Sequence, residues 1–163
     1  MCQPWVLWAH AKHDFQHYAT AVSDDFQFIV KADRAVTQNS LRNSENWVDN
    51  SQFLGAEYAT RNIVAPYAEG LGQNAGVLLF QFPPVNAQLR RQPAQFAEHL
   101  HKFLSALPEG IRYAIEFREA TLMSHGLPAL YASRMCTTAS DCIHACHHCC
   151  SSAASWPKRQ LYP

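Results

Sequence analysis

Three short segments of the chain carry the apolar pattern of β-strands. They are residues 26–31, 77–82 and 112–117. The second segment reads VLLFQF and runs into Pro83 and Pro84, a pair that neither a helix nor a continuing central strand accommodates. Its polar residue, Gln81, stands one position before the end of an otherwise apolar run. The pattern therefore predicts three strands, of which the second has an unexpected carboxamide near its end.

The segments between these strands predict helices. In residues 92–107 the apolar side chains recur at helical spacing, and Pro93 suits the first turn. Residues 56–72 predict another helix, which Pro66 kinks or divides. The polar stretch 37–53 is expected to form a long loop. Because strands that alternate with helices usually pair in parallel, the predicted fold class is α/β.

The alternate residues of each predicted strand separate into two faces. One face is apolar throughout, as expected of a surface that helices cover. It comprises Phe26, Phe28, Val30, Leu78, Phe80, Phe82, Tyr113, Ile115 and Phe117. The other face becomes polar at the carboxyl end of every strand. It comprises Gln27, Ile29, Lys31, Val77, Leu79, Gln81, Ala114, Glu116 and Arg118.

The polar ends of this second face predict a ligand site. In a closed α/β barrel the face points inward and substrates bind at its carboxyl rim, whereas in an open sheet the same edge forms the ligand crevice. We interpret Glu116 and Lys31 as candidate catalytic residues and Gln81 and Arg118 as candidate substrate-binding residues. Lys31 and Arg118 would hold an anion, while Glu116 would transfer protons. The alternative is an ion network that only neutralises charge at a barrel mouth.

Composition narrows the classes of function. The chain has 163 residues, of which 48% are hydrophobic, enough for one domain with a core. Thirteen basic and thirteen acidic residues cancel, so no basic field marks a nucleic-acid binder. No apolar run approaches the ~20 residues that span a bilayer. We therefore expect a cytoplasmic protein that binds a small molecule and neither nucleic acid nor membranes.

The strand segments resemble, in order and spacing, the YecE-like family, catalogued as domain of unknown function 72. The shared motifs are Phe-x-Phe-x-x-Lys, Leu-x-Phe-Gln-Phe-Pro-Pro and Tyr-x-x-Glu-Phe-Arg, within about residues 18–125. The motifs match at the proline pair and at the four candidate residues Lys31, Gln81, Glu116 and Arg118. The resemblance implies an eight-stranded barrel of the TIM type. It implies no reaction and no cofactor, because the activity of the family is not established.

Departures from the family pattern predict an incomplete barrel. Family members open with a Gly-Thr-Ser-Gly-Trp type strand and a Glu-x-Asn-x-x-Phe-Tyr strand, and neither motif occurs here. A barrel typically takes about 250 residues, so we expect an interior fragment from an interrupted or wrongly delimited reading frame. We favour a barrel enzyme as the parent and a non-functional fragment for the chain as written. The expected division is an irregular segment at 1–17, a partial barrel domain at 18–130, and a tail at 131–163.

The tail concentrates cysteine and histidine. Cys146 and Cys149 have the spacing of zinc ligands, and His144 or His148 could complete a tetrahedral set. A small metal-binding or interaction module is therefore an alternative function. Against it, the second ligand pair of a zinc site, a dozen or more residues away, is missing. We favour an unstructured tail read out of frame, because its Ser, Ala, Cys and His bias lacks the apolar pattern of a barrel strand.

This interpretation of the tail predicts that it does not hold a metal. Titration of the purified chain with Co²⁺, followed by thiolate absorption, should give no stoichiometric binding at micromolar metal. Saturation at one Co²⁺ per chain, lost in Cys146→Ser, would contradict it and favour the metal-binding module.

Overall fold

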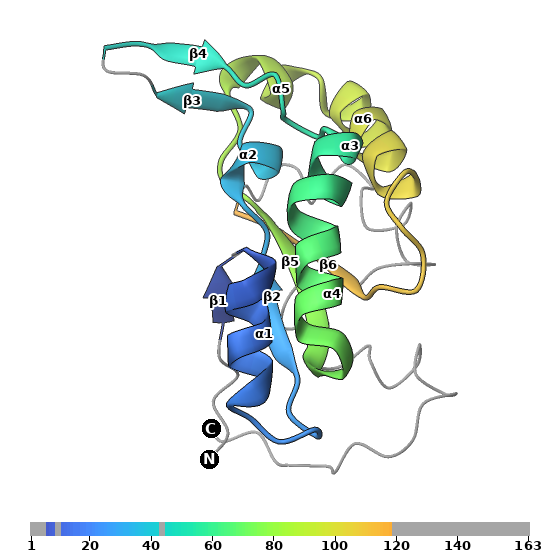
Figure 1. Cartoon of the computed structure of the whole chain (residues 1–163). Helices are drawn as coiled ribbons and strands as arrows, with labels where there is room; N and C mark the ends of the chain where they lie inside the picture. The colour runs from blue at the N-terminus through green and yellow to red at the C-terminus, as the bar shows by residue number, and fades with distance from the viewer. Residues whose placement is uncertain (1–5, 9–10, 43–44, 119–163) are drawn as a thin grey trace, which may run out of the picture.

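A computed structural model describes residues 6–8, 11–42 and 45–118, which form an α/β fold (Figure 1). The strands in chain order are β1 (Val6–Trp8), β2 (Phe28–Lys31), β3 (Ser40–Arg42), β4 (Trp47–Asp49), β5 (Ala75–Phe82) and β6 (Tyr113–Phe117). The helices are α1 (Lys12–Thr20), α2 (Arg34–Thr37), α3 (Ala56–Ala59), α4 (Ala65–Leu71), α5 (Ala87–Arg91) and α6 (Pro93–Ser105). A π-helical turn (Thr60–Val64) joins α3 to α4, and a 3-10 turn (Gly72–Asn74) joins α4 to β5.

The main sheet is parallel and follows the order of the chain. Its four strands are arranged β1-β2-β5-β6, and every neighbouring pair is parallel. Strands β2, β5 and β6 confirm the three predicted segments, with ends that differ by at most two residues from the predicted ones. The α/β class and the parallel direction are likewise confirmed. Because the strand order never reverses, this part of the sheet has no topological switch point.

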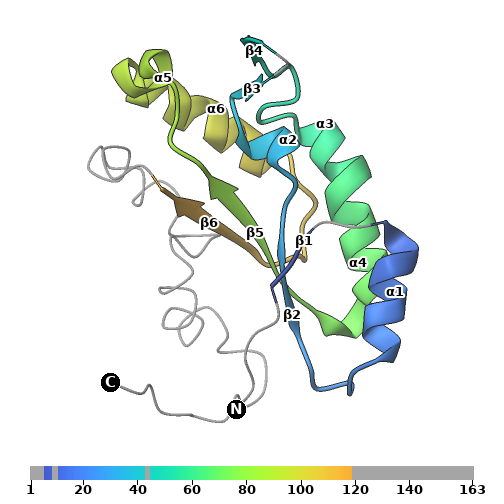
Figure 2. The ribbon, with the colours of Figure 1, turned by 90° about the vertical axis from the view of Figure 1, so that its left-hand side faces the viewer.

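The apolar face predicted from the sequence is the one that the helices cover. Figure 2 shows α1, α3 and α4 along one side of the sheet. Phe80 meets Phe103 of α6 edge to face at a ring distance of 5.3 Å, and Phe82 meets Phe96 of the same helix at 6.0 Å. These four rings are almost completely buried. Since burying one such side chain contributes about 1.5–3 kcal/mol, this layer supplies much of the driving force for folding.

The helix predicted over residues 56–72 is continuous but contains an irregular turn. Ahead of Pro66, the N–H of Ala65 donates to the carbonyl of Thr60, five residues back instead of four. Proline has no N–H and crowds the preceding turn, so a widened turn lets the helix continue past it. The helix ends at Gly72, whose φ of +53° suits a residue without a side chain.

Two segments have more order than the sequence pattern predicts. Residues 6–8 and 12–17, expected to be irregular, form β1 and most of α1. Helix α1 fully buries only Phe15, so its apolar stripe is too narrow to recognise. The stretch 37–53, expected to be a loop, contains the antiparallel β3–β4 hairpin. Its strands have no buried side chains, so the alternation that marks a half-buried strand is absent.

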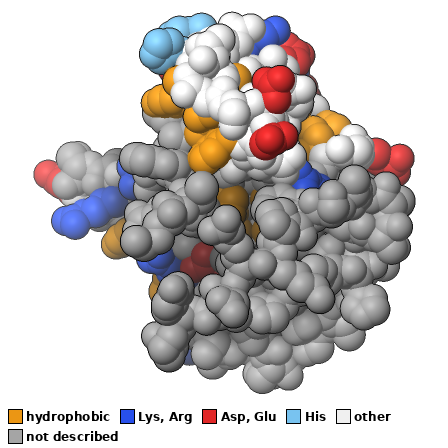
Figure 3. Space-filling view, turned by 90° about the horizontal axis from the view of Figure 1, so that it is seen from below, with side chains coloured by type: hydrophobic (Ala, Val, Ile, Leu, Met, Phe, Trp, Pro, Cys, Tyr) orange, Lys and Arg blue, Asp and Glu red, His pale blue; other side chains and the backbone are white. Residues whose placement is uncertain are grey.

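On the one face that Figure 3 shows, the described residues have no dominant charge. Seen from below, where the strands of the main sheet begin, acidic, basic, histidine and hydrophobic side chains are interspersed (Figure 3). This mixture agrees with the formal net charge of +0 for the whole chain. Within the described part of the chain, no helix combines the length and the hydropathy needed to cross a membrane.

The contact between α1 and α4 predicts an unusual effect of Gly70→Ala. An alanine Cβ at this position would lie 2.5 Å from the Cβ of Phe15 and 2.8 Å from the carbonyl oxygen of Lys12. In an ordinary helix the change stabilises by about 1 kcal/mol, but here the overlap should lower the free energy of unfolding by about 1–3 kcal/mol. Urea denaturation measures the change. An increase in stability would show that α1 does not pack against α4 in this way.

Candidate functional site

The four residues predicted to form a site lie at the carboxyl ends of three neighbouring strands. Gln81 of β5 and Glu116 of β6 are paired in register, so their side chains leave the sheet on the same face. Lys31 of β2 pairs with Leu79, which lies two residues before Gln81 on that face. Arg118 follows β6 and extends its ladder, since its N–H donates to the carbonyl of Phe82. The parallel register thus brings the predicted side chains together.

Gln81 connects the two charged side chains beside it. The Lys31 Nζ donates to Gln81 Oε1 at 3.1 Å, and Gln81 Nε2 donates to Glu116 Oε1 at 2.7 Å. An ammonium group only donates and a carboxylate only accepts, so the two neighbours fix which end of the carboxamide faces each of them. This geometry explains the carboxamide near the end of an apolar strand: it satisfies a cation on one side and an anion on the other.

Arg118 is bound more loosely than the other three residues. Its Nε lies 3.7 Å from Glu116 Oε1, and its side chain is 58% exposed. Exposed ion pairs of this length contribute about 0–1 kcal/mol, whereas a hydrogen bond to a charged group contributes about 1.5–3 kcal/mol. The hydrogen bonds of Gln81 therefore dominate the cluster, and the arginine remains able to turn toward solvent.

The arrangement places a positive and a negative side chain within one small area. A neutral amide separates the ammonium group of Lys31 from the carboxylate of Glu116. Among the described residues, Glu116 Oε1 accepts both contacts of this side chain, and Oε2 has no partner. The glutamate side chain is 29% exposed, so a solute can reach it. Such a cluster can bind an anion beside a carboxylate that accepts or donates a proton.

The alternative metal site lies outside the described residues. Cys146, Cys149, His144 and His148 all belong to the stretch after residue 118. Within the described ranges, no group of three or more His, Cys, Asp or Glu side chains is placed to hold a metal ion.

Two tyrosines with perturbed acidity belong to the core and not to the rim. Burial raises the pKa of Tyr113 to about 12, and its hydroxyl donates to the carbonyl of Pro108 at 2.9 Å. Burial also raises the pKa of Tyr67, whose hydroxyl is enclosed and has no hydrogen-bond partner among the described residues. Both groups stay neutral at ordinary pH, so they add no charge to the site.

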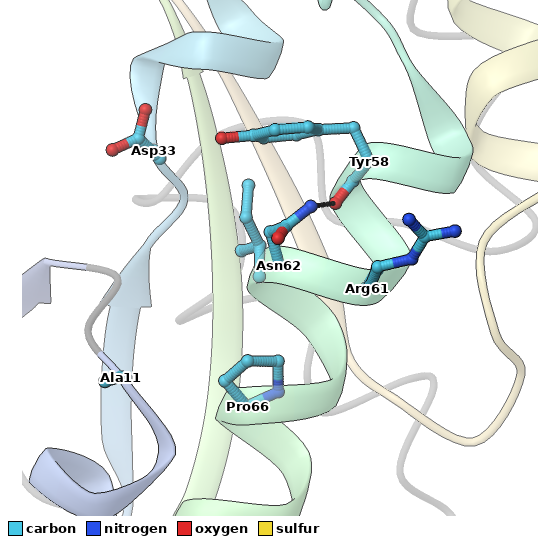
Figure 4. Close-up of a pocket in the computed structure, with 7 residues that line it drawn as sticks. Ala11, Asp33, Tyr58, Arg61, Asn62 and Pro66 are labelled. Atoms are coloured by element: carbon cyan, nitrogen blue, oxygen red, sulfur yellow. Dashed lines mark hydrogen bonds between the residues drawn. The ribbon is translucent and has the colours of Figure 1, made fainter.

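A cleft that the sequence did not indicate lies beside the widened helical turn. It has a volume of about 440 Å³, and Asp33, Tyr58, Asn62 and Pro66 are among the residues that line it. Figure 4 shows the Tyr58 hydroxyl directed toward the loop that carries Asp33, while the Asn62 side chain donates to the Tyr58 carbonyl at 3.0 Å. The signal in the sequence was Pro66, which predicted a kink but not a hollow beside it. None of the four rim residues lines this cleft.

The bridging role of Gln81 predicts the effect of replacing it by leucine. Gln81→Leu keeps the volume but removes both hydrogen bonds, which leaves partly buried charged groups without their shared partner. The free energy of unfolding should fall by about 1–3 kcal/mol, as measured by urea denaturation. The matched control is Gln95→Leu on the exposed side of α6, where a change within about 0.5 kcal/mol is expected. Equal changes in the free energy of unfolding for the two substitutions would contradict the bridging role of Gln81.

Comparison with known proteins supports the resemblance carried by the strand motifs. Residues 9–157 match the family model described as "Protein of unknown function DUF72". The match extends beyond residues 18–125 at both ends and runs through most of the Cys/His-rich tail. No curated protein and no solved structure matches the chain. Because the family model covers most of the 163 residues, the chain belongs to the DUF72 family, whose function is unknown.

Proposed function

We propose that the described sheet is part of a TIM-type α/β barrel that binds a small polar or anionic ligand at the carboxyl rim of its strands. The sequential strand order and the uniform parallel direction support the barrel, since each further strand would be added in the same sense around the sheet. Membership in the DUF72 family is consistent with this fold. In barrels of this kind the binding residues come from the carboxyl ends of several strands.

The observation that carries the proposal is the hydrogen-bonded cluster of Lys31, Gln81 and Glu116. Three adjacent strands each contribute one polar side chain at the same edge, and the central amide holds a cation and an anion apart. A network that served only to neutralise charge would gain more from a direct contact between ammonium and carboxylate. Here the amide lies between the two charges, and the carboxylate of Glu116 keeps one oxygen without a partner among the described residues.

The proposed roles follow from the chemistry of each side chain. Lys31 and Arg118 attract and hold the anionic part of the ligand, and the planar guanidinium group provides paired donors for a carboxylate or a phosphate. Gln81 orients the ligand through its carboxamide. Glu116 acts as general acid or base if the complete protein catalyses a reaction. Lys31 and Glu116 are therefore the candidates for catalysis.

Ligand-binding measurements on the full chain test this proposal. Inorganic phosphate and succinate serve as probes, and their binding is followed by isothermal titration. We expect saturable binding of at least one probe, weakened about tenfold or more by Lys31→Ala because an opposing charge is lost. Glu116→Gln should alter the affinity for the anionic probes, because the variant has no carboxylate beside the site. Circular dichroism verifies that the variants fold.

Two substitutions on α6 provide matched controls. Lys102 and Glu98 form an exposed ion pair at 2.7 Å. Both belong to α6, one of the helices that cover the apolar face of the sheet. Lys102→Ala and Glu98→Gln are the same kinds of substitution as Lys31→Ala and Glu116→Gln, and they should leave probe binding unaltered. The rim assignment is wrong if wild type binds a probe and the Lys31 and Glu116 variants bind it as these controls do.

A further inference from the structure

The β3–β4 hairpin and α2 carry polar and aromatic side chains that line a groove. None of the rim residues Lys31, Gln81, Glu116 and Arg118 lines it. The hairpin follows α2 and projects from the body of the fold (Figure 1). Asn50 fixes its base, since Nδ2 donates to the carbonyls of Ala35 and Gln38 at 2.6 and 2.7 Å. The N–H of Leu54 also donates to the carbonyl of Val36 at 3.0 Å. The hairpin is therefore held in place against α2 although its own strands are only three residues long.

A groove of about 540 Å³ lies between α2 and this hairpin. Its lining includes Arg34, Gln38, Arg42 and Trp47. The volume falls within the range of about 300–1,000 Å³ that is usual for small-molecule sites. The groove is thus large enough for a ligand of the size of a nucleotide.

Two arginines in the groove have no partner for their charge in the part of the chain that the structure describes. Both Arg34 and Arg42 are exposed, and neither guanidinium group forms a hydrogen bond or ion pair within the described residues. The acidic side chain in the lining, Asp33, already accepts the N–H of Ala35 at 2.7 Å as the cap of α2. The lining therefore carries an excess of positive charge with the paired donors that suit a phosphate.

Trp47 gives the groove a flat apolar surface. Its side chain is 65% exposed, the highest value among the exposed large hydrophobic side chains of the described residues. It pairs directly across the hairpin with Arg42, so the indole and a guanidinium group leave the same face of the two strands. An exposed indole beside an arginine is a platform on which an aromatic ring can stack.

We propose that the groove between α2 and the β3–β4 hairpin binds a nucleotide. The base stacks on Trp47, the phosphate pairs with Arg34 and Arg42, and the carboxamide of Gln38 is placed to hydrogen-bond the base edge. A single nucleotide fits better than a polynucleotide, because the chain has a formal net charge of +0 and therefore no excess positive charge to attract a long phosphate backbone. The inference does not depend on the function proposed for the rim.

Calorimetric titration of the full chain with adenosine 5′-monophosphate tests the inference. Adenosine and inorganic phosphate are titrated separately, and each should bind more weakly than the nucleotide that combines them. Trp47→Ala should weaken nucleotide binding about fivefold or more, as expected when a stacking platform is removed. Trp47→Phe should restore most of the affinity because it keeps an aromatic face. Arg42→Ala should reduce the affinity for the nucleotide and for phosphate but not for adenosine.

The control is Arg61→Ala, which removes an exposed arginine that lies outside the groove and pairs with Glu57. It should bind the nucleotide as wild type does. No saturable binding by wild type, or equal affinity of wild type and Trp47→Ala, would overturn the inference. A single-stranded oligonucleotide that binds far more tightly than the mononucleotide would assign the groove to nucleic acid instead. Self-association that Trp47→Ala abolishes would assign it to a second copy of the chain.

Discussion

The in-register parallel pairing of β2, β5 and β6 is the constraint on which the other features depend. Side chains alternate between the two faces of a strand, so one register places the wholly apolar face under the helices and the polar residues near the strand ends on the opposite face. A slip of one residue would exchange the faces and bury Gln81 against α6. Gly76 helps to hold this register, because a Cβ there would lie within 2.4 Å of the Phe28 carbonyl oxygen. Packing and candidate chemistry thus rest on one geometric relationship.

The same constraint explains why three side chains suffice to define a candidate site. Each strand is apolar along most of its length and has a polar residue at its last or last-but-one position, so the cluster forms where the strand ends coincide. Gln81 is central because it is neutral and can donate and accept at once. A charged residue in its place would pair with one neighbour and repel the other. The carboxamide therefore keeps Lys31 and Glu116 close without leaving either unpaired.

Much of the central sheet could be predicted from the sequence, because its strands bury one face and show it as alternation. Helix α6 was predicted for the same reason, since Phe96, Leu100 and Phe103 recur at helical spacing and are buried. The β3–β4 hairpin was not predicted. None of its strand side chains is buried, and its position is set by the hydrogen bonds of Asn50, a tertiary contact that has no periodic signal. The order seen in α1 depends in the same way on the close approach of Phe15 to Gly70.

The membership of the candidate site could be predicted, but its internal connections could not. Residue type and strand position placed Lys31, Gln81, Glu116 and Arg118 at one edge. The bridging by Gln81 depends on the stagger between β2 and β5, in which Lys31 pairs with Leu79 and not with Gln81. Likewise, the groove that contains Trp47 exists only because the hairpin folds back beside α2. Periodicity along one segment carries no information about the distance between two segments.

The most direct test of this account is a nuclear Overhauser measurement on the side-chain amide protons of Gln81. We expect cross-peaks from these protons to the γ-methylene of Glu116 and the ε-methylene of Lys31. Cross-peaks to the rings of Phe96 or Phe103 would place Gln81 on the helix-covered face and would contradict it.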